Sequence, residues 1–187
     1  MRCFLAIELP AEVRGQIAAL QEELRATVRS VRWTRPEQIH LTLKFLGDVP
    51  DAEVAAVCAA VGETAKAYPP FELEIGGAGC FPGGGPVRVV WAGIARPAAE
   101  LAACQQGCEA RLAELGFKPE GRPYTPHLTI GRLNDFRDSA RVRSAVEAQA
   151  AFHAGRLTVT EITLFESVLR PTGAEHHVIS RARLAER

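Results

Sequence analysis

Residues 39–46 read Ile-His-Leu-Thr-Leu-Lys-Phe-Leu. The polar residues His40, Thr42 and Lys44 alternate with apolar neighbours, which is the period-two pattern of a strand with one polar and one apolar face. We therefore expect residues 39–46 to form a strand on which His40 and Thr42 share one face.

The same order of residues returns in the second half of the chain. Residues 126–130 read Pro-His-Leu-Thr-Ile, and the two histidines are separated by 127 − 40 = 87 positions. The same offset relates Pro10 to Pro97, Ile7 to Ile94, Thr42 to Thr129, Asp48 to Asp135 and Asp51 to Asp138. Because several features keep one register, we expect an internal duplication, about 1–87 and 88–187, within a single domain over 1–187.

Hydrophobic periodicity and turn residues predict the remaining elements. Strands are expected at 4–9, 71–75 and 87–94, with a closing strand pair at 156–165 and 176–184. Helices are expected at 11–26, 51–67, 97–115, where Pro97 opens the helix, and 138–150. The pattern predicts an α+β fold of two lobes related by a pseudo-twofold axis, each an antiparallel sheet covered by helices. The two strands that carry His40 and His127 would face each other across a central cleft.

Composition excludes several classes of protein. The 187 residues contain 22 basic and 22 acidic side chains, so no overall positive charge attracts long nucleic acid. No apolar run approaches the roughly 20 residues of a membrane helix. Five cysteines without a Cys-x-x-Cys pair are typical of free thiols, and indicate neither a zinc site nor a disulfide framework. We expect a cytoplasmic protein without a membrane partner, and no obligate protein partner is evident.

The repeated His-x-Thr triplet indicates catalysis on a phosphodiester. With 5 histidines and 10 threonines in the chain, chance would give about 0.3 such triplets, so two in equivalent positions are unexpected. Cleavage of a phosphodiester requires a base on one side of phosphorus and an acid on the other, and histidine serves both roles near neutral pH. A threonine hydroxyl two residues along the same face can donate a hydrogen bond to a phosphate oxygen.

These motifs resemble those of the two-histidine phosphoesterase superfamily, specifically the RNA 2′,3′-cyclic phosphodiesterases that are also known as 2′-5′ RNA ligases. The resemblance covers nearly the whole chain. It rests on RCFLAIELP (2–10), HLTLKFLGD (40–48), RVVWAGI (88–94) and RPYTPHLTIGR (122–132).

The resemblance implies a bilobal fold and an activity that requires neither a metal nor another cofactor. It implies that His40 is the proton donor and His127 the proton acceptor, with Thr42 and Thr129 beside them. The implied substrates are RNA 3′ ends or nucleotides bearing a 2′,3′-cyclic phosphate, which is opened to a 2′-phosphomonoester, and the reverse reaction would be 2′-5′ ligation.

Alternative functions stay open at this point. A sister enzyme of the same superfamily could cleave 2′-5′-linked oligonucleotides or ADP-ribose cyclic phosphate with the same two histidines. A nucleotide-binding module without catalysis would not require both titratable groups. A serine or cysteine hydrolase is disfavoured because the chain has no Gly-x-Ser-x-Gly and no cysteine near either motif histidine in sequence.

Other residues are weaker candidates for substrate binding. Arg132 is a candidate phosphate ligand because guanidinium can hold two oxygens at once. Phe4, Trp33, Phe45 and Tyr124 lie near the motifs in sequence and could stack on a nucleobase, although packing in the core is the commoner role of such residues.

Two further features are interpreted as structural. The glycine-rich segment 76–86 lacks the ending of a phosphate-binding loop and is expected to be a flexible connection. His176 and His177 are adjacent in a predicted strand, so they should point to opposite faces and cannot bind one metal. With His153, they are expected to be structural or surface residues.

Overall fold

The computed structural model describes residues 1–96, 99–170 and 173–185. Its helices are α1 (Ala11–Thr27), α2 (Val54–Ala65), α3 (Ala99–Glu114) and α4 (Ser139–Glu147), with short 3₁₀ turns η1 (Pro36–Gln38) and η2 (Asp51–Glu53). Its strands are β1 (Arg2–Glu8), β2 (Arg32–Trp33), β3 (His40–Asp48), β4 (Phe71–Phe81), β5 (Val89–Arg96), β6 (His127–Arg132), β7 (His153–Val159), β8 (Glu161–Arg170) and β9 (Gly173–Arg183).

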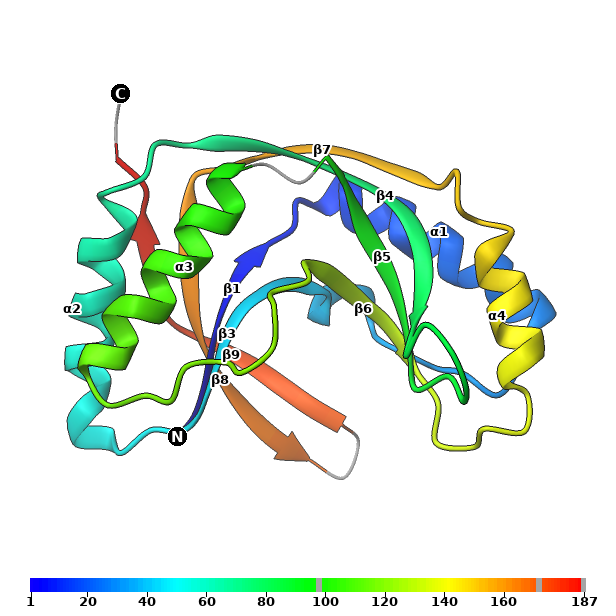
Figure 1. Ribbon diagram of the computed structural model, residues 1–187, viewed down its shortest axis with the longest axis horizontal. Coiled ribbons are helices and arrows are strands. Elements are labelled where there is room, and N and C mark those ends of the chain that lie inside the picture. The colour runs from blue at the N-terminus through cyan, green and yellow to red at the C-terminus, as the bar shows by residue number, and fades with distance from the viewer. Residues whose placement is uncertain (97–98, 171–172, 186–187) are drawn as a thin grey trace.

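The strands of the described residues form one curled antiparallel sheet (Figure 1). The strand order is β7-β4-β5-β6-β3-β1-β8-β9, and short β2 pairs with β6. This arrangement confirms the α+β fold. The two motif strands, β6 and β3, are the central neighbours, with three further strands of the main order on either side.

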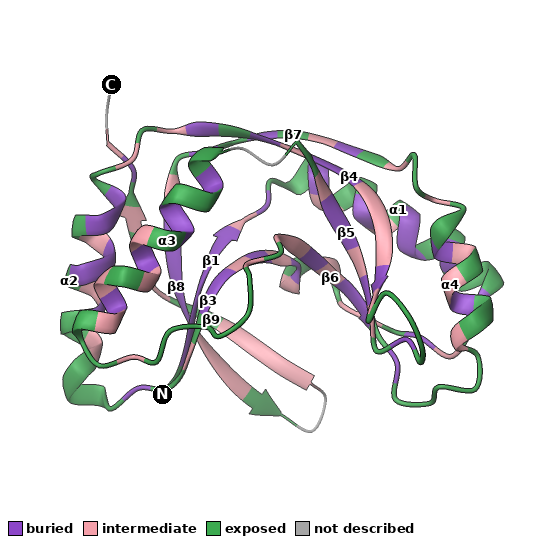
Figure 2. Cartoon of the chain, in the orientation of Figure 1, coloured by how far each residue is buried: buried purple, intermediate pink, exposed green. Residues whose placement is uncertain are grey.

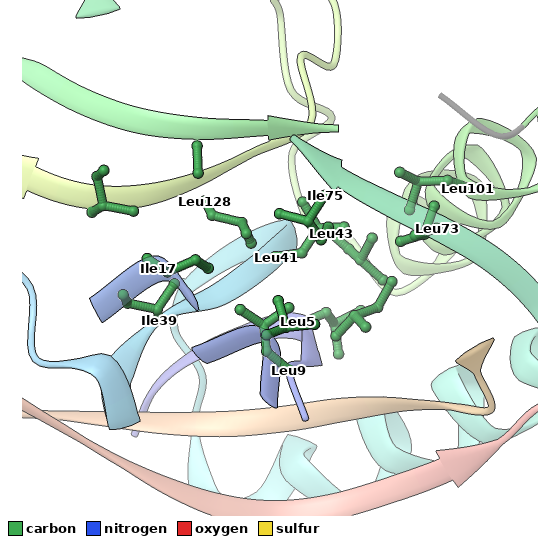
Figure 3. Packing of buried hydrophobic residues seen from close by; sticks show 14 of the residues in the cluster. Leu5, Leu9, Ile17, Ile39, Leu41, Leu43, Leu73, Ile75, Leu101 and Leu128 are labelled. Carbon is green, nitrogen blue, oxygen red and sulfur yellow. The ribbon is translucent and has the colours of Figure 1, made fainter. Parts of the chain in front are cut away.

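One face of the sheet packs against the four helices. Figure 1 shows α2 and α3 together at one end of the molecule and α1 and α4 at the other. Helix α1 follows Pro10 and buries Val13, Ile17, Leu20 and Leu24, whose spacing forms one apolar stripe. Figure 2 shows that buried and exposed segments alternate along the helices. Figure 3 shows Ile17 of α1 and Leu101 of α3 in the same cluster as the strand residues Leu41 and Leu128. The main core therefore lies between the helices and one face of the sheet.

The two halves of the chain do not coincide with the two halves of the sheet. Strand β4 from the first half of the chain lies beyond β5 and β6, whereas β8 and β9 from the second half lie beyond β1. Helix α1 contacts β7, and α2 contacts α3, β8 and β9. Each lobe is thus built from both halves of the chain, which sequence periodicity did not indicate.

Some predicted elements differ from those observed. The segment 76–86 was expected to be a connection throughout, but Gly76–Phe81 continues β4 and pairs with β5 and β7. Gly79 belongs there because a side chain at this position would overlap the indole of Trp91. The predicted strand 156–165 is two strands, interrupted at Thr160. Pro97, expected to open a helix, lies outside the described residues.

Candidate active site

The central strand pair brings the two motifs together. Leu41 of β3 lies opposite Leu128 of β6, and both leucines are fully buried in the main core. Because the strands are antiparallel, this register places His40 across from Thr129 and Thr42 across from His127. The four half-buried motif side chains lie on the face opposite that core. Each histidine therefore faces the threonine of the other motif.

Both imidazole rings are held in the same way. His40 Nδ1 lies 2.8 Å from the carbonyl oxygen of Gln38, and His127 Nδ1 lies 2.8 Å from that of Thr125. A carbonyl oxygen only accepts, so each Nδ1 carries the hydrogen and donates it. In the neutral rings, Nε2 is left unprotonated and free to exchange a proton with a substrate.

A β-bulge follows Thr42 in β3. The ladder with β1 steps from Thr42 to Lys44 and leaves Leu43 as the extra residue. Period-two alternation predicted that Lys44 would share the polar face with His40 and Thr42. The bulge instead turns Lys44 into the protein, where its Nζ lies 2.6 Å from a carboxylate oxygen of Glu109. The next residue on the motif face is Phe45, which is 67% exposed.

An equivalent bulge follows Thr129 in β6. The ladder with β5 steps from Thr129 to Gly131 and leaves Ile130 as the extra residue. The two extra residues are separated by 130 − 43 = 87 positions, the offset of the motifs. This bulge returns the side chain of Arg132 to the face of His127 and Thr129.

A buried glutamine from a covering helix binds each bulge. The side-chain amide of Gln21 in α1 donates to the carbonyl oxygens of Ile130 and Thr34, both at 2.8 Å. The amide of Gln105 in α3 donates to the carbonyl oxygen of Leu43 at 3.4 Å. The carbonyl of each extra residue thereby accepts a hydrogen bond from a glutamine inside the protein, where an unpaired polar group is costly, and that of Ile130 also accepts one from the N–H of Thr34 at 3.0 Å.

Aromatic side chains surround His40. Its ring stacks on Phe4 with centroids 4.7 Å apart and meets His176 edge-on at 5.1 Å. Burial, together with the charge that His176 gains in acid, lowers the pKa of His40 to about 4. Glu8 lies across from His40 on β1, but its carboxylate accepts hydrogen bonds from Arg181 and Thr163. In the free protein His40 is therefore neutral at pH 7.

His176 lies beside His40 at the candidate site, a position that sequence reasoning did not indicate. It was expected to be structural or on the surface, yet strand β9 places it against His40 and Phe4. The adjacent His177 is exposed, as alternation along a strand requires. The alternation of the two histidines was recognised from sequence. That β9 lies next to β8 and brings one of them to the motif face follows only from the sheet order.

The surroundings of His127 are different. The ring of Phe81 meets His127 edge-on, with ring centroids 4.9 Å apart. The ring centroid of Trp91 lies 5.4 Å from that of Phe81. His153, by contrast, is exposed and lies 3.6 Å from Glu74, away from both motifs, as expected of a surface residue. The two histidines of the motifs thus share a backbone geometry but not an environment.

The remaining candidates for substrate binding separate into exposed and packed residues. Phe45 and Arg132 are exposed on the motif face. Tyr124 packs against the core and donates its hydroxyl to the carbonyl oxygen of Thr42 at 3.0 Å, which suits a positioning role. Trp33 packs against the core on the face opposite the motifs, so it is not available to a nucleobase there. Phe4 is buried, and its ring supports His40.

Hollows on the surface of the described residues include one beside His40 and one far from the motifs. A small pocket of about 150 Å³ beside His40 is lined by Glu8, Arg14, Phe165 and His176, among others. A larger one of about 410 Å³ lies between α1 and α4 and contains no motif residue. Within the described ranges, no three His, Cys, Asp or Glu side chains are grouped closely enough to hold a metal ion. No helix in the same ranges is long and apolar enough to cross a membrane.

The model of the 2′-5′ RNA ligase superfamily matches residues 9–169. The chain belongs to this superfamily. An RNA 2′,3′-cyclic phosphodiesterase of Methanothermobacter thermautotrophicus is 34% identical over 173 residues, which cover 92% of this chain and 93% of the relative. The superfamily is enzymatic, and the relative's name describes a hydrolase.

Solved structures of the superfamily share the fold. TT0787 of Thermus thermophilus superposes with a TM-score of 0.83 at 29% identity and covers the whole of both chains. LigT of E. coli in complex with 3′-AMP superposes with a TM-score of 0.78 at 28% identity, covering 99% of this chain and 98% of LigT. The fold of this chain therefore agrees with the one that the resemblance implied, because solved members of the superfamily have the same fold.

Proposed function

We propose that this protein is an RNA 2′,3′-cyclic phosphodiesterase that opens a terminal cyclic phosphate to a 2′-phosphomonoester. One observation carries the proposal. Two histidines with identically held rings face each other's threonines on one surface of the sheet. This arrangement supplies two proton-transfer groups and two hydrogen-bond donors to one phosphate. The name of the Methanothermobacter relative supports the same activity.

In the proposed mechanism, His127 acts as the base and His40 as the acid. His127 Nε2 takes a proton from water while the water oxygen bonds to phosphorus opposite O3′. The bond from phosphorus to O3′ breaks, and the departing oxygen receives a proton from His40. The phosphate remains on O2′. If the 5′-hydroxyl of a second RNA took the place of water, the same steps would join it to the cyclic phosphate as a 2′-5′ bond and leave a 3′-hydroxyl.

The role of His40 as acid requires a proton that the free site disfavours. The pKa of His40 is about 4 without substrate. A phosphate anion next to the ring favours the charged form and raises this pKa. We therefore propose that substrate binding and protonation of His40 are coupled, so that the acid is formed in the complex.

The hydroxyls of Thr42 and Thr129 would donate to the non-bridging phosphate oxygens, whose negative charge grows in the transition state. Arg132 would contact a phosphate of the substrate through its guanidinium. Exposed Phe45 is the side chain best placed to stack on a nucleobase, and Tyr124 would act by fixing the carbonyl of Thr42. The mechanism requires neither a metal nor another cofactor.

The proposal places the enzyme in the cytoplasm with RNA 3′ ends as its substrates. All five cysteines are free, and four of them are buried, which suits a reducing compartment. Sister substrates with 2′-5′ links or an ADP-ribose cyclic phosphate would present the same phosphodiester to the same pair of histidines, so they belong in the same assay.

The direct test is a hydrolysis assay with excess chelator and product analysis by phosphorus NMR. We expect full activity with chelator and a 2′-phosphate product. Loss of activity that a divalent ion restores would contradict the two-histidine mechanism. A predominant 3′-phosphate product would instead overturn the assignment of His40 as the acid beside O3′.

A mutation series tests the roles of the four motif residues. Loss of one hydrogen-bond donor to a phosphate costs about 10²–10³ in rate, because the remaining groups still bind. Thr42→Ala and Thr129→Ala should therefore retain more activity than His40→Ala and His127→Ala. A threonine variant as inactive as the matching histidine variant would contradict this order.

A further inference from the structure

Two aromatic side chains beside His127 lie on the motif face. Directly opposite residues of an antiparallel pair point to the same face of a sheet, so Trp91 of β5 shares the face of Thr129. Gly79 of β4 is opposite Trp91, and Phe81 follows Gly79 by two residues, so Phe81 lies on this face as well. Neither aromatic side chain belongs to the apolar clusters that the described residues form.

The indole of Trp91 lies across two glycines. A methyl group built on Gly79 would overlap Cε2, Cζ2 and Cη2 of the indole, and one built on Gly93 would lie 3.1 Å from its Cζ3. Side chains stand roughly perpendicular to a sheet, so the ring lies over the strands with one face against the backbone. Trp91 is half-buried, and the exposed part of its ring is the face directed away from the sheet.

A tryptophan at this position brings a polar group that packing does not need. Its Nε1–H is buried and has no acceptor within the part of the chain that the structure describes. A buried donor without a partner is destabilising, and a phenylalanine could cover the glycines without one. The wide aromatic face of the indole is the property that a phenylalanine would lack, and such faces stack on nucleobases.

Phe81 extends this aromatic surface to His127. The ring centroids of Phe81 and Trp91 are 5.4 Å apart, and Phe81 meets the ring of His127 edge-on at 4.9 Å between centroids. The loop that follows Phe81 is fixed by Arg143 of α4, which donates to three backbone carbonyls of residues 82–85 at 2.8–3.1 Å. Trp91 and Phe81, here called the aromatic platform, are thus held in place before any ligand binds.

The aromatic platform lies on the His127 side of the site. The sheet order places β5 and β4 beyond β6, whereas the strands that supply the neighbours of His40, β1, β8 and β9, lie beyond β3 (Figure 1). In the proposed function, His127 takes the proton of the nucleophile, opposite the O3′ that His40 protonates. A nucleophile on this side therefore approaches beside the aromatic platform. Water has no group that could stack there, but the 5′-terminal nucleotide of an RNA has one.

We propose that the aromatic platform binds the first nucleobase of an RNA with a 5′-hydroxyl end, as the second substrate of 2′-5′ ligation. The assignment of sides rests on the proposed function. The 5′ oxygen of the stacked nucleotide bonds to phosphorus, and its proton passes to His127 Nε2. The bond from phosphorus to O3′ breaks as O3′ receives the proton of His40, so no water is consumed. Because every base has a π face, the aromatic platform accepts any first nucleotide.

Ligation kinetics test the aromatic platform during turnover. An RNA with a cyclic phosphate end is kept at one concentration, and the initial rate of joining is measured against the concentration of a 5′-hydroxyl RNA. Trp91→Leu should raise the KM for the 5′-hydroxyl RNA about tenfold, the effect of losing one base–aromatic stack. The ratio of joining to hydrolysis should fall with it. Trp91→Phe, which keeps a smaller aromatic face, should lie between Trp91→Leu and the wild type.

The other tryptophan of the chain provides the matched control. Trp33 packs against the core on the opposite face, so Trp33→Phe should keep the ratio of joining to hydrolysis. An equal KM for the 5′-hydroxyl RNA in the wild type and Trp91→Leu would overturn the proposal. An equal fall of joining and hydrolysis in Trp91→Leu would also overturn it, because the aromatic platform would then serve the site as a whole.

Fluorescence tests the aromatic platform without turnover. The chain has two tryptophans, so Trp33→Phe leaves Trp91 as the only one that emits. We expect a short RNA with hydroxyls at both ends to quench this emission saturably, because a base stacks on the indole. A nucleoside 2′-phosphate, whose base lies on the His40 side, should leave the emission unchanged. No quenching by the RNA, or equal quenching by both ligands, would contradict the proposal.

The outcome is separable from that of the proposed function. A chain that neither hydrolyses nor joins a cyclic phosphate, but whose Trp91 is quenched by the 5′-hydroxyl RNA alone, would refute the proposed reaction and support the stacking site. A chain that hydrolyses the cyclic phosphate, without quenching of Trp91 and with a ratio of joining to hydrolysis that Trp91→Leu leaves unchanged, would support the reaction and refute the stacking site.

Discussion

At the scale of single residues, the two motif histidines have the same hydrogen bond and different neighbours. Each ring donates through Nδ1 to the carbonyl of the residue two positions earlier. Only His40 is packed between a phenylalanine and a third histidine. The protein can thereby assign different protonation behaviour to two copies of one motif, which is how pairs of titratable groups are given distinct roles.

The influence of His176 on His40 can be measured directly. His176→Phe keeps an aromatic ring against His40 but removes the charge that His176 gains in acid, so the pKa of His40 should rise above about 4. His176→Ala also admits water, so the pKa should rise further, toward the unperturbed value of about 6.5. NMR titration of the histidine ring protons gives both values. His153→Phe, at an exposed position of β7, is the control. An unchanged or lower pKa of His40 in the His176 variants would contradict this account.

Burial of neutral His40 also makes stability depend on pH. The pKa of His40 is about 4 when folded and about 6.5 when unfolded, so the unfolded chain binds the proton first as the pH falls. The free energy of unfolding should therefore decrease as the pH is lowered from about 6.5 toward 4.

His40→Gln removes this contribution. Between pH 7 and pH 4.5 the variant should lose less stability than the wild type, by on the order of 2 kcal/mol. Urea denaturation at both pH values measures the difference, with His153→Gln as the control. Equal losses in the wild type and His40→Gln would show that the pKa of His40 is the same in the folded and the unfolded chain, which would contradict this prediction.

At the scale of secondary-structure elements, the two bulges determine which side chains reach the motif face. Without them, Lys44 would lie beside Thr42, and Phe45 and Arg132 would turn into the protein. A glutamine from the helix layer binds the carbonyl of each extra residue, at 2.8 Å for Gln21 and 3.4 Å for Gln105.

Loss of Gln21 should destabilise the protein more than loss of Gln105. Gln21→Leu removes two hydrogen bonds, one to the part-buried carbonyl of Thr34 and one to the buried carbonyl of Ile130, which keeps the N–H of Thr34 as a donor. We expect a loss of about 2 kcal/mol. Gln105→Leu removes a longer hydrogen bond, and we expect about 1 kcal/mol. Urea denaturation gives both values. A larger loss of stability in Gln105→Leu than in Gln21→Leu would contradict this prediction.

The sequence predicted the motif strands well because their alternation is regular up to the threonine. It failed at Lys44, because a bulge leaves no mark in a period-two pattern. It also failed at 76–81, where glycine content favoured a loop, although tertiary packing of Trp91 against Gly79 requires glycine in a strand. Strand β2 has only two residues, too few for any periodicity to indicate it.

At the scale of the whole molecule, the sheet is arranged symmetrically about the boundary between β6 and β3. Three further strands of the main order lie on either side of this central pair. The equivalent bulges, clamping glutamines and histidine hydrogen bonds follow the same symmetry. We propose that an internal duplication, about 1–87 and 88–187, produced this arrangement within one domain. The offset of 87 was visible in the sequence, but the exchange of strands between the lobes was not, because local patterns do not specify distant pairing partners.

The exchange of strands predicts how fragments behave. The fragment 1–87 contains β1 and β4 without their partners β8, β5 and β7, so it buries little of its core. We expect 1–87 and 88–187 each to lack a cooperative thermal transition by circular dichroism. An equimolar mixture should regain the transition and bind a short RNA ending in a 2′-phosphate. A cooperative transition in either fragment alone would contradict this prediction.

The central position of β1 has a consequence for synthesis on the ribosome. Strand β1 emerges before both of its neighbours in the sheet. It can pair with β3 soon afterwards, but its other edge waits for β8, as in the pairing of Ala6 with Thr163. Until then, a nascent chain exposes an unpaired strand edge, which is a hazard for aggregation. Stalled chains that end before β8 should be sensitive to protease, and longer chains should be protected. The histidine strands would then lack the β8–β9 hairpin that supplies His176, so an interrupted translation product could not present a complete site to the RNA around it.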